Sequence, residues 1–309
     1  MKISICALTY RRPEGLLRLL EGLNALDLTA PEPAIEVIVV DNDPGGSAGE
    51  VCSRMRAGFR WNLRHEVETR RGIVHARNKA VDLVSTESDW IAFIDDDEVP
   101  ENVWIAELVK VQRDTCADVV AGRVDPYFPE PVDEWIVQGG FFQKRRFPNG
   151  GAIPHAFTNN VLFRATILAD ERFQPPFAER YALTGGEDRH FFQRVRMAGY
   201  RLRWADEAVV TEWIPASRAN ARWLVRRQFR VGNSLAFIES EFDPGLRQWL
   251  RRCVRACYTV ASGIATLPRA WIRGRVSYVR ACQRIASGLG RLWGMLGRTY
   301  EEYREVHGS

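Results

Sequence analysis

The chain has 309 residues, of which 46% are hydrophobic and 27% are charged, and its formal net charge is +4. This composition excludes an intrinsically disordered chain and allows one large domain with an appendage, or two domains. The charge is uneven, because residues 246–300 contain 11 arginines and no lysine, aspartate or glutamate. Subtracting these 11 charges leaves −7 for the rest of the chain, so a basic tail follows an acidic body and favours an acidic surface as partner.

The first part of the chain alternates apolar strands with amphipathic helices. Predicted strands lie at 3–8, 35–40, 61–67, 90–94 and 118–124, and predicted helices lie at 13–26, 48–57, 72–84 and 101–115. Continuous apolar strands between helices indicate an α/β fold whose mostly parallel sheet is covered on both faces. Thr9, Asp41 and Asp95 each follow such a strand, so we expect them to meet at the sheet edge where ligands bind.

The most informative motif is the acidic run Asp95-Asp96-Asp97-Glu98, which directly follows the apolar strand at 90–94. Packed carboxylates repel one another, and removing them from water costs free energy unless a cation offsets the cost. Hard oxygen ligands of this kind favour a divalent metal ion that is shared with a phosphorylated substrate. The alternative is a solvated acidic turn that binds nothing.

Prolines and glycines interrupt residues 125–158, and such a long irregular stretch is typical of a functional or mobile segment. A strand is predicted at 159–168, a helix at 189–198 and a strand at 200–210, and Ser217 is the predicted N-cap of a helix that runs to about residue 239. Glu187 and Asp188 come directly before the helix at 189–198. They are either a stabilising acid pair at a helix N-terminus or, together with the acidic run, the source of a general base.

The tail interleaves tryptophan and tyrosine with its arginines on helical stretches. Its longest uncharged run, 256–268, is too short to span a bilayer, which takes about 20 residues. The pattern favours a helix on an anionic membrane surface, and the alternative is an arginine-rich helical pair packed on the body. Nucleic acid is not expected as a partner, because no binding motif accompanies the charge.

The cellular context is predicted from what the sequence lacks. The first residues do not have the pattern of a signal peptide, and the six cysteines form no Cys-x-x-Cys pair. We therefore expect reduced thiols in a cytoplasmic protein that is peripheral on the inner face of the cell membrane.

Five short motifs, in this order, resemble the inverting family-2 glycosyltransferases of the GT-A fold; they lie at 7–12, 39–42, 71–78, 93–98 and 186–188. The resemblance covers about residues 1–240. It implies a GT-A (Rossmann-like) domain with a nucleotide-sugar-binding half at 1–124 and an acceptor-binding half at 125–240, followed by an Arg/Trp-rich membrane-associating helical extension at 241–309. Residues 212–230 look like those of exopolysaccharide glucosyltransferases of the succinoglycan-assembly kind.

The resemblance also implies a reaction: metal-dependent inverting transfer of a sugar from a nucleotide sugar, of which UDP-glucose is the first expectation, to a hydroxyl of a lipid-linked saccharide. Asp188, with Glu187 beside it, matches the catalytic base. Mn²⁺ or Mg²⁺ would bind Asp95, Asp97 and Glu212, the last standing near where many relatives have a histidine. The expected donor-binding residues are Thr9, Tyr10, Arg12, Asp41, Asn42, Arg71, Gly72, Arg77, Asp95 and Asp96. The expected acceptor-binding residues are Asn159, Asn160, Trp213 and Arg222.

Two other functions fit parts of the sequence. The spacing Asp95-x-Asp97-x-Val99 matches haloacid-dehalogenase-type phosphatases, in which the first aspartate is a covalent nucleophile. A non-catalytic membrane scaffold of the same fold is the third possibility. Arg222, Arg226 and Arg230 recur every four residues and form either a phosphate-binding face or a solvated one. The histidines are expected to be structural; they are His65, His75, His155, His190 and His307.

Overall fold

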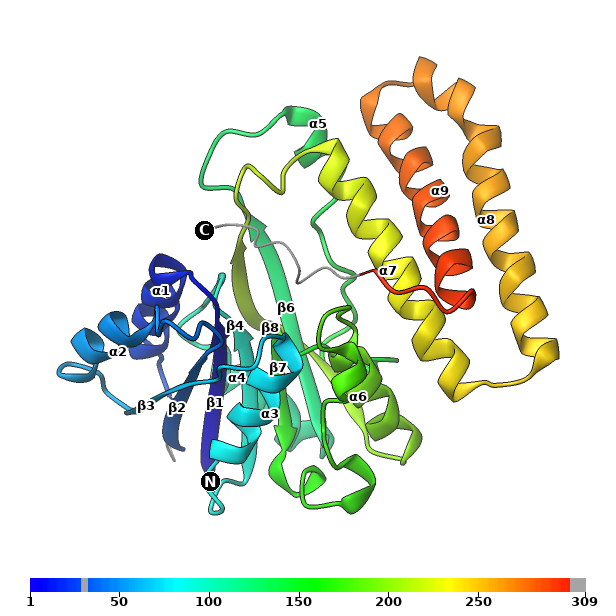
Figure 1. Ribbon diagram of the computed structural model, residues 1–309. Helices are drawn as coiled ribbons and strands as arrows, with labels where there is room; N and C mark the ends of the chain where they lie inside the picture. Colours follow the sequence, from blue (N-terminus) through cyan, green and yellow to red (C-terminus); the bar gives the residue numbers. More distant parts are fainter. Residues whose placement is uncertain (29–32, 301–309) are drawn as a thin grey trace.

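An eight-stranded sheet runs through the middle of the molecule, with helices on both of its faces (Figure 1). The computed structural model describes residues 1–28 and 33–300. Residues 301–309, which include His307 and the end of the predicted extension at 241–309, lie outside the described residues. The arrangement confirms the expected α/β fold class.

The strands follow the apolar segments that the sequence predicted, with two differences. The predicted strand at 159–168 ends at Arg164 and continues as a 3-10 turn, and a short strand that was not predicted follows the acidic run. The strands are β1 (Lys2–Thr9), β2 (Ala34–Asp41), β3 (Asn62–Val67), β4 (Trp90–Asp95), β5 (Glu98–Pro100), β6 (Val119–Tyr127), β7 (Asn160–Arg164) and β8 (Leu202–Trp213).

The sheet has the order β3-β2-β1-β4-β7-β6-β8-β5. Strands β3, β2, β1 and β4 pair in parallel, and so do β6 and β8. Strand β7 is antiparallel to both β4 and β6, and β5 is antiparallel to β8. The sheet is therefore mixed, and the parallel arrangement that we expected holds for the half that carries the acidic run.

The helices also lie close to the predicted positions. They are α1 (Pro13–Asn24), α2 (Gly49–Arg56), α3 (Ile73–Leu83), α4 (Trp104–Thr115), α5 (Glu134–Gln138), α6 (Glu187–Met197), α7 (Ala221–Phe242), α8 (Leu246–Ile272) and α9 (Arg275–Met295), with 3-10 turns at Ala165–Ile167, Glu171–Phe173 and Glu179–Tyr181. The predicted N-cap Ser217 is wrong. Turns continue through residue 219, and the Asn220 side chain accepts the cap hydrogen bond from the backbone N–H of Trp223 at 2.9 Å.

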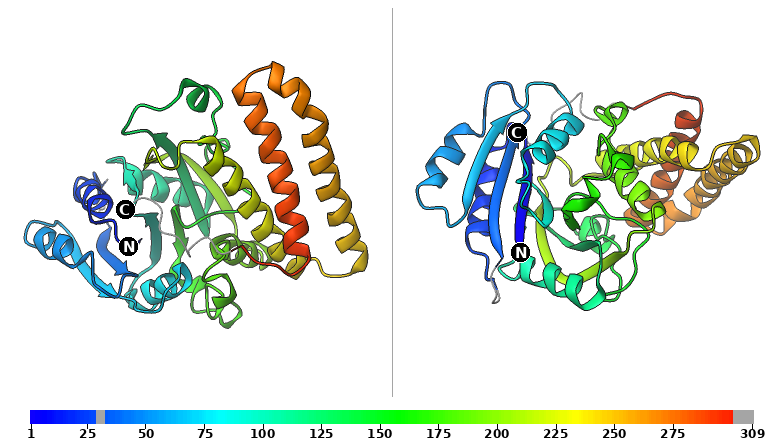
Figure 2. Two further views of the ribbon diagram at one scale, coloured as in Figure 1. Left: turned by 45° about the horizontal axis from the view of Figure 1, so that its top comes forward. Right: turned by 90° about the horizontal axis from the view of Figure 1, so that it is seen from below.

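Alternating side chains of the strands fill two separate cores. Ile3, Ile5 and Ala7 of β1 belong to the core under α1, α2 and α4. Cys6 and Leu8 belong to the core under α3 and α6 on the opposite face. The views in Figure 2 show the same division of the helices between the two faces of the sheet. Burial on both faces explains why these strands are continuously apolar in sequence.

The parallel strands bring the predicted polar ends together, as expected. In the sheet register Thr9 pairs with Asp41, and Leu8 pairs with Asp95. After the acidic turn, β5 pairs with the end of β8 so that Glu98 lies opposite Glu212. This pairing connects the nucleotide half of the chain to its second half directly at the acidic run.

The C-terminal hairpin of α8 and α9 packs on the body through α7. A Cβ atom on Gly290 of α9 would lie 2.0 Å from the carbonyl oxygen of Phe229, and one on Gly232 of α7 would lie 2.2 Å from that of Ser287. Glycine is therefore needed for the backbones to approach this closely. Helix α8 is the outermost of the three in Figures 1 and 2. Within residues 1–28 and 33–300, no helix has both the length and the apolar character needed to cross a membrane.

Candidate active site

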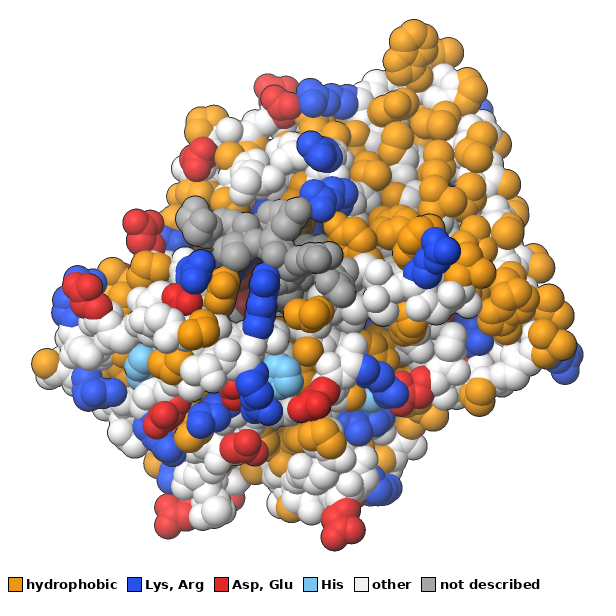
Figure 3. All heavy atoms as spheres, viewed as in Figure 1, with side chains coloured by type: hydrophobic (Ala, Val, Ile, Leu, Met, Phe, Trp, Pro, Cys, Tyr) orange, Lys and Arg blue, Asp and Glu red, His pale blue; other side chains and the backbone are white. Residues whose placement is uncertain are grey.

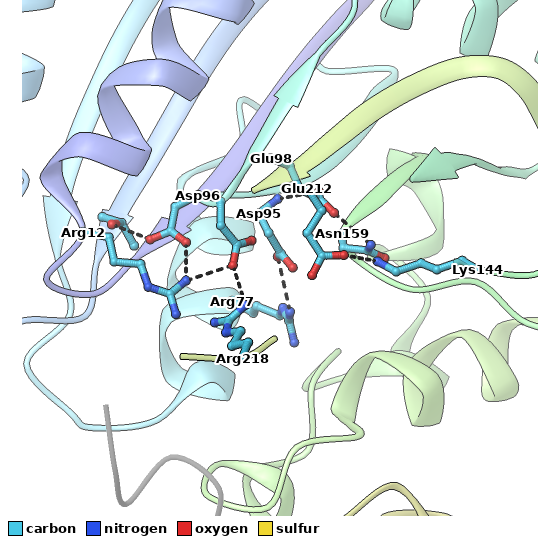
Figure 4. Close-up of polar contacts among 11 residues, drawn as sticks. Arg12, Arg77, Asp95, Asp96, Glu98, Lys144, Asn159, Glu212 and Arg218 are labelled. Carbon is cyan, nitrogen blue, oxygen red and sulfur yellow. Dashed lines mark hydrogen bonds and ion pairs between the residues drawn. The ribbon is translucent and has the colours of Figure 1, made fainter. Parts of the chain in front are cut away.

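The acidic run lies at the bottom of a cleft, at the carboxyl end of β4 (Figure 4). Asp96 is buried; its carboxylate accepts hydrogen bonds from Thr9 Oγ1 at 2.8 Å and from Arg12 Nη1 at 3.0 Å. Burial raises the pKa of Asp96, and the Arg12 guanidinium opposes that rise. Thr9 and Arg12 therefore hold Asp96 in place within the sheet edge.

Asp97 points toward two arginines from opposite ends of the domain. Its Oδ2 atom lies 3.2 Å from Arg12 Nη1 and 2.9 Å from Arg218 Nη1. Arg218 comes from the segment between β8 and α7, so this ion pair closes one side of the cleft. The sequence analysis did not assign Arg218 a role, although it lies in the segment 212–230 that resembles exopolysaccharide glucosyltransferases.

Asp95 is the most exposed member of the run, with 41% of its side chain accessible, and it faces Arg77 at 4.0 Å. Burial of the group, opposed by Arg77 and reinforced by Asp97 and Asp96, raises the pKa of Asp95 to about 7. Asp95 and Asp97 thus present carboxylate oxygens to the cleft, which are the ligands that a hard cation prefers.

Glu98 and Glu212 lie opposite each other on β5 and β8, and Lys144 forms an ion pair with Glu212. Lys144 Nζ lies 2.9 Å from Glu212 Oε2, and Glu98 accepts a hydrogen bond from Asn159 Nδ2 at 3.0 Å. Burial raises the pKa of Glu98 well above its usual range, and Asp95 adds to this. For Glu212, burial also acts upward, but Lys144, Arg227 and Arg218 together outweigh it and the pKa is lowered. Lys144 was not predicted, because the irregular stretch at 125–158 offers no pattern that places it.

Two cavities meet at these acids. The smaller, of about 300 Å³, has lining residues from the ends of β1 and β4 and the start of α3, including Thr9, Tyr10, Asn42 and Arg71. The larger, of about 540 Å³, extends toward α6 and α7. Residues that line both are Arg77, Asp95, Glu212, Arg227 and Arg230. The cleft can thus hold two ligands whose reacting ends meet near Asp95.

On the side of the smaller cavity, Asn42 orders the loop that leads to Gly72. Its Nδ2 donates to the carbonyl oxygens of Glu68 and Arg70 at 2.9 and 2.7 Å, and its Oδ1 accepts from the backbone N–H of Gly72 at 3.0 Å. Gly72 has a φ of +129°, and a Cβ there would lie 2.9 Å from the Ala182 carbonyl oxygen. The loop conformation therefore depends on glycine at this position.

Asp41 has a different environment from the other predicted donor residues. It is fully buried, and its carboxylate accepts from the backbone N–H groups of Asp43 and Ala48 at 2.9 and 2.7 Å and from the Ser47 hydroxyl. These contacts fix the connection between β2 and α2. The carboxylate is thereby committed to local structure beside the cavity.

Glu187 and Asp188 have different surroundings although they are neighbours on α6. Glu187 is buried and forms an ion pair with Arg77 of α3, whose side chain is 6% exposed. Asp188 is half-buried and lines the larger cavity. Glu187 lines this cavity too, but its buried ion pair fixes the start of α6 against α3, so Asp188 is the more accessible of the two acids.

The predicted acceptor residues fall into two groups. Asn159 and Asn160 both line the larger cavity. Asn160 has its side chain fully engaged, accepting from Trp104 Nε1 and donating to the carbonyl oxygens of Arg123 and Ala208. Trp213 stacks with Arg18 outside the two main cavities, and Arg222 is exposed at the start of α7.

Several lining residues of the larger cavity escaped the sequence prediction. Arg227 was not assigned a role; it lies one helical turn from Arg230 on α7, and the two residues line both cavities. Of the predicted every-fourth face only Arg230 lines these cavities, because Arg222 is exposed and Arg226 is hydrogen-bonded to the Tyr300 hydroxyl. His155, expected to be structural, lines the larger cavity, and burial and nearby arginines lower its pKa. The spacing of three residues between Arg227 and Arg230 was the available signal.

The side chains of the acid cluster can supply only some of the ligands that a divalent cation needs. In the part of the chain that the structure describes, no three His, Cys, Asp or Glu side chains form a ready-made metal site. Asp95 and Asp97 are hard oxygen donors, and both line the cleft. Such a pair fits a metal ion whose remaining ligands come from a phosphorylated substrate and water, as Mg²⁺ prefers. Glu212 is ion-paired with Lys144, and Asp97 is ion-paired with Arg12 and Arg218, so either carboxylate must exchange a basic partner to bind an ion.

Comparison with known sequences gives a family. The model of glycosyl transferase family 2 matches residues 4–171. The chain is 31% identical over 315 aligned residues to the succinoglycan biosynthesis protein ExoM of Rhizobium meliloti, covering 99% of this chain and 97% of that protein. It is 26% identical to the glycosyltransferase AglE of Haloferax volcanii, covering 74% of this chain and 71% of that protein.

Solved structures share the fold at low identity. The mannosyltransferase PcManGT of Pyrobaculum calidifontis, solved with GDP-Man and Mn²⁺, has a TM-score of 0.64 and 18% identity, covering 94% of this chain and 87% of that one. TarS 1-349 of S. aureus, solved with UDP-GlcNAc, has a TM-score of 0.53 and 15% identity, covering 97% and 93%. These similarities confirm the GT-A fold that the motifs predicted.

Proposed function

Because this chain belongs to glycosyltransferase family 2, we propose that it transfers a sugar from a nucleotide-sugar donor to a hydroxyl of a saccharide acceptor, with inversion at the anomeric carbon. One observation carries the proposal: two cavities meet at Asp95, and Asp188 lines the larger of them. Membership of this family replaces the phosphatase interpretation of the Asp95-x-Asp97 spacing.

The biological role that we propose is assembly of a surface or exopolysaccharide on a lipid-linked acceptor at the inner face of the membrane. Its support is the full-length similarity to a protein named for succinoglycan biosynthesis. We propose a UDP-sugar, with UDP-glucose first, as the donor. The structures of similar fold hold different nucleotides, UDP-GlcNAc in one and GDP-Man in the other, so fold alone does not select the base.

The nucleotide is assigned to the smaller cavity. Thr9, Tyr10, Asn42 and Arg71 line it, together with the glycine-dependent loop at Gly72. Arg12 and Arg77 also line the smaller cavity, and each forms an ion pair with an acid of the run, so their proposed role includes positioning Asp96 and Asp95. Asp41 would act on the donor only through the β2–α2 connection that it fixes.

Asp95 and Asp97 are the proposed protein ligands of Mn²⁺ or Mg²⁺. The ion would neutralise negative charge on the departing nucleoside diphosphate. Arg227 and Arg230 line both cavities, so their guanidinium groups can add to this neutralisation from the opposite wall.

Asp188 is the proposed general base in the larger cavity. It would accept the proton of the acceptor hydroxyl as that oxygen attacks the anomeric carbon. The new carbon–oxygen bond forms on one face, and the bond from the anomeric carbon to the diphosphate oxygen breaks on the other. Asn159 and His155 line the same cavity and are proposed to contact the acceptor. Glu187 serves this step indirectly, by fixing the start of α6 through Arg77.

Thermal unfolding of the purified protein against UDP-, GDP- and dTDP-sugars, with and without Mn²⁺, tests the donor. A ligand at 100 times its Kd stabilises the folded state by about 2.7 kcal/mol, so one nucleotide class should raise the Tm, and more so with metal. Asp97→Asn should lose the metal-dependent part of that rise. No shift with any donor in folded protein would overturn the proposal.

A further inference from the structure

The outer face of α8 carries a continuous apolar stripe. Exposed apolar side chains follow one another at spacings of three and four residues, namely Leu250, Val254, Tyr258, Ala261, Ala265, Pro268 and Ile272. Their exposed fractions include 50% at Leu250, 69% at Val254 and 84% at Ile272. From Leu250 to Ile272, at 1.5 Å per residue, the stripe is about 33 Å long, so it is much larger than the isolated apolar side chains that are normal on a surface.

The opposite face of α8 is already used within the chain. Ala256, Gly263 and Ala270 are buried, and a Cβ on Gly263 would lie 2.6 Å from Ile285 of α9. Helix α8 is thus fixed on α9 by its small residues, while its large apolar residues face away from the body. Figure 3 shows hydrophobic side chains gathered over the part of the molecule that α8 and α9 form.

Arginines flank the stripe on one side. Arg251, Arg255, Arg269 and Arg273 are exposed, and each directly follows a member of the stripe. No acidic residue occurs between 246 and 300. An apolar stripe beside an arginine row, with Tyr258 and an exposed Trp271 near the boundary, is typical of a helix that lies in the interface of an anionic bilayer.

We propose that α8 is the membrane-docking element of this protein, with the stripe from Leu250 to Ile272 buried at the headgroup boundary of an anionic bilayer and the arginine row on its phosphates. The inference rests on the proposed lipid-linked acceptor, and it names the surface that brings the enzyme to it. A second copy of the chain is a poorer occupant, because two faces with these arginines and no acids repel each other. Helices α7 and α9 connect the docked helix to the cleft.

Flotation of the full chain with vesicles tests the docking surface. Vesicles of phosphatidylcholine alone are compared with vesicles that contain phosphatidylglycerol, at low and high salt. We expect binding to the anionic vesicles and loss of part of it as salt rises. Val254→Glu with Ile272→Glu should lower the vesicle partition coefficient about tenfold or more.

The matched control is Val103→Glu with Met197→Glu, which adds the same charge at exposed apolar sites on other helices and should bind like the parent. Arg251→Gln with Arg255→Gln should reduce the preference for anionic lipid. Because all six positions are exposed, the Tm should change little, and a circular dichroism melt checks this. Equal binding by the Val254/Ile272 variant, or no binding of the parent to anionic vesicles, would overturn the inference. Since these vesicles contain no donor or acceptor, this result is independent of the donor test.

Discussion

The acidic cleft and the C-terminal hairpin distribute charge in opposite ways. In the cleft Asp96, Asp97, Glu187 and Glu212 are each ion-paired with a basic side chain from another element. In the hairpin, no acidic residue accompanies the arginines of residues 246–300. Balanced charges in the cleft join distant segments of the chain, whereas unbalanced charges at the surface are available to a partner. Changes in the cleft should therefore affect folding or catalysis, and changes on the outer face of α8 should affect neither.

The largest expected effect separates the two acids at the start of α6. Asp188→Asn should retain the fold and the donor-dependent Tm shift but lower the transfer rate by about 10²–10⁴, because it removes the proposed general base. Glu187→Gln should instead destabilise the protein by about 3 kcal/mol, since Arg77 would lose its buried partner and keep only Asp95, at 4.0 Å, as a counter-ion. Transfer assays and chemical denaturation measure the two effects.

Each substitution is the control for the other, because the two are chemically alike and at adjacent positions. Transfer by Asp188→Asn at nearly the parent's rate would remove Asp188 from the mechanism. A folded parent with no transfer activity would instead favour the non-catalytic scaffold. A loss of transfer by Glu187→Gln in fully folded protein would mean that the acid roles on α6 are reversed.

How far the sequence predicted the structure differs between these regions. The strand ends Thr9, Asp41 and Asp95 were placed at one sheet edge correctly, because apolar strands and parallel pairing leave little choice there. Strand β5 was missed, since three residues after an acidic turn carry no period of their own and pair only because β8 lies beside them.

Within the site, the sequence motifs predicted which acids face the cleft, but they did not predict which residues each side chain contacts. Asp95 and Asp188 face the cleft as the motifs suggested. Asn160 and Asp41 look equally polar in sequence, yet their side chains are used by neighbouring backbone groups. Lys144 and Arg218 reach the acids from irregular segments, and long-range contacts of this kind leave no local pattern.

A smaller effect tests the junction of the hairpin with the cleft. Gly290→Ala should destabilise the protein by about 1–3 kcal/mol, because its Cβ would lie 2.0 Å from the Phe229 carbonyl oxygen and the backbones must separate. Helix propensity predicts the opposite sign, a gain of roughly 1 kcal/mol. Gly49→Ala in α2, where the nearest atom is 3.8 Å away, is the control that should show no loss.

Phe229, whose carbonyl oxygen Gly290 approaches, lies between Arg227 and Arg230 in the sequence of α7. These two arginines line both cavities. Gly290→Ala should therefore also weaken the donor-dependent Tm shift, whereas Val254→Glu with Ile272→Glu should leave it unchanged. An unchanged donor shift in the destabilised Gly290 variant would mean that α7 and the hairpin move without affecting the cleft.

The smallest expected effect concerns Lys144. Lys144→Met should cost on the order of 1 kcal/mol, because the lysine is partly exposed and water screens the charge. Without Lys144, burial raises the pKa of Glu212 in the folded state. At pH values above the pKa of Glu212 in the unfolded chain, the folded state then binds more protons than the unfolded one. The stability difference from the parent should consequently grow from pH 5 to pH 7. Lys110→Met, which breaks an exposed pair with Glu107, should show no such growth.

Lys144→Met also decides the role of Glu212, because it frees that carboxylate for other partners. If Lys144 has taken the place of a metal ligand, Glu212→Gln should leave the Mn²⁺-dependent Tm shift intact, and Lys144→Met with Glu212→Gln should recover the stability lost in the single variant. Loss of the metal-dependent shift in Glu212→Gln would instead make Glu212 the third protein ligand. In that case the lysine must move aside when the donor and metal bind, and Lys144→Met should tighten metal binding rather than weaken it.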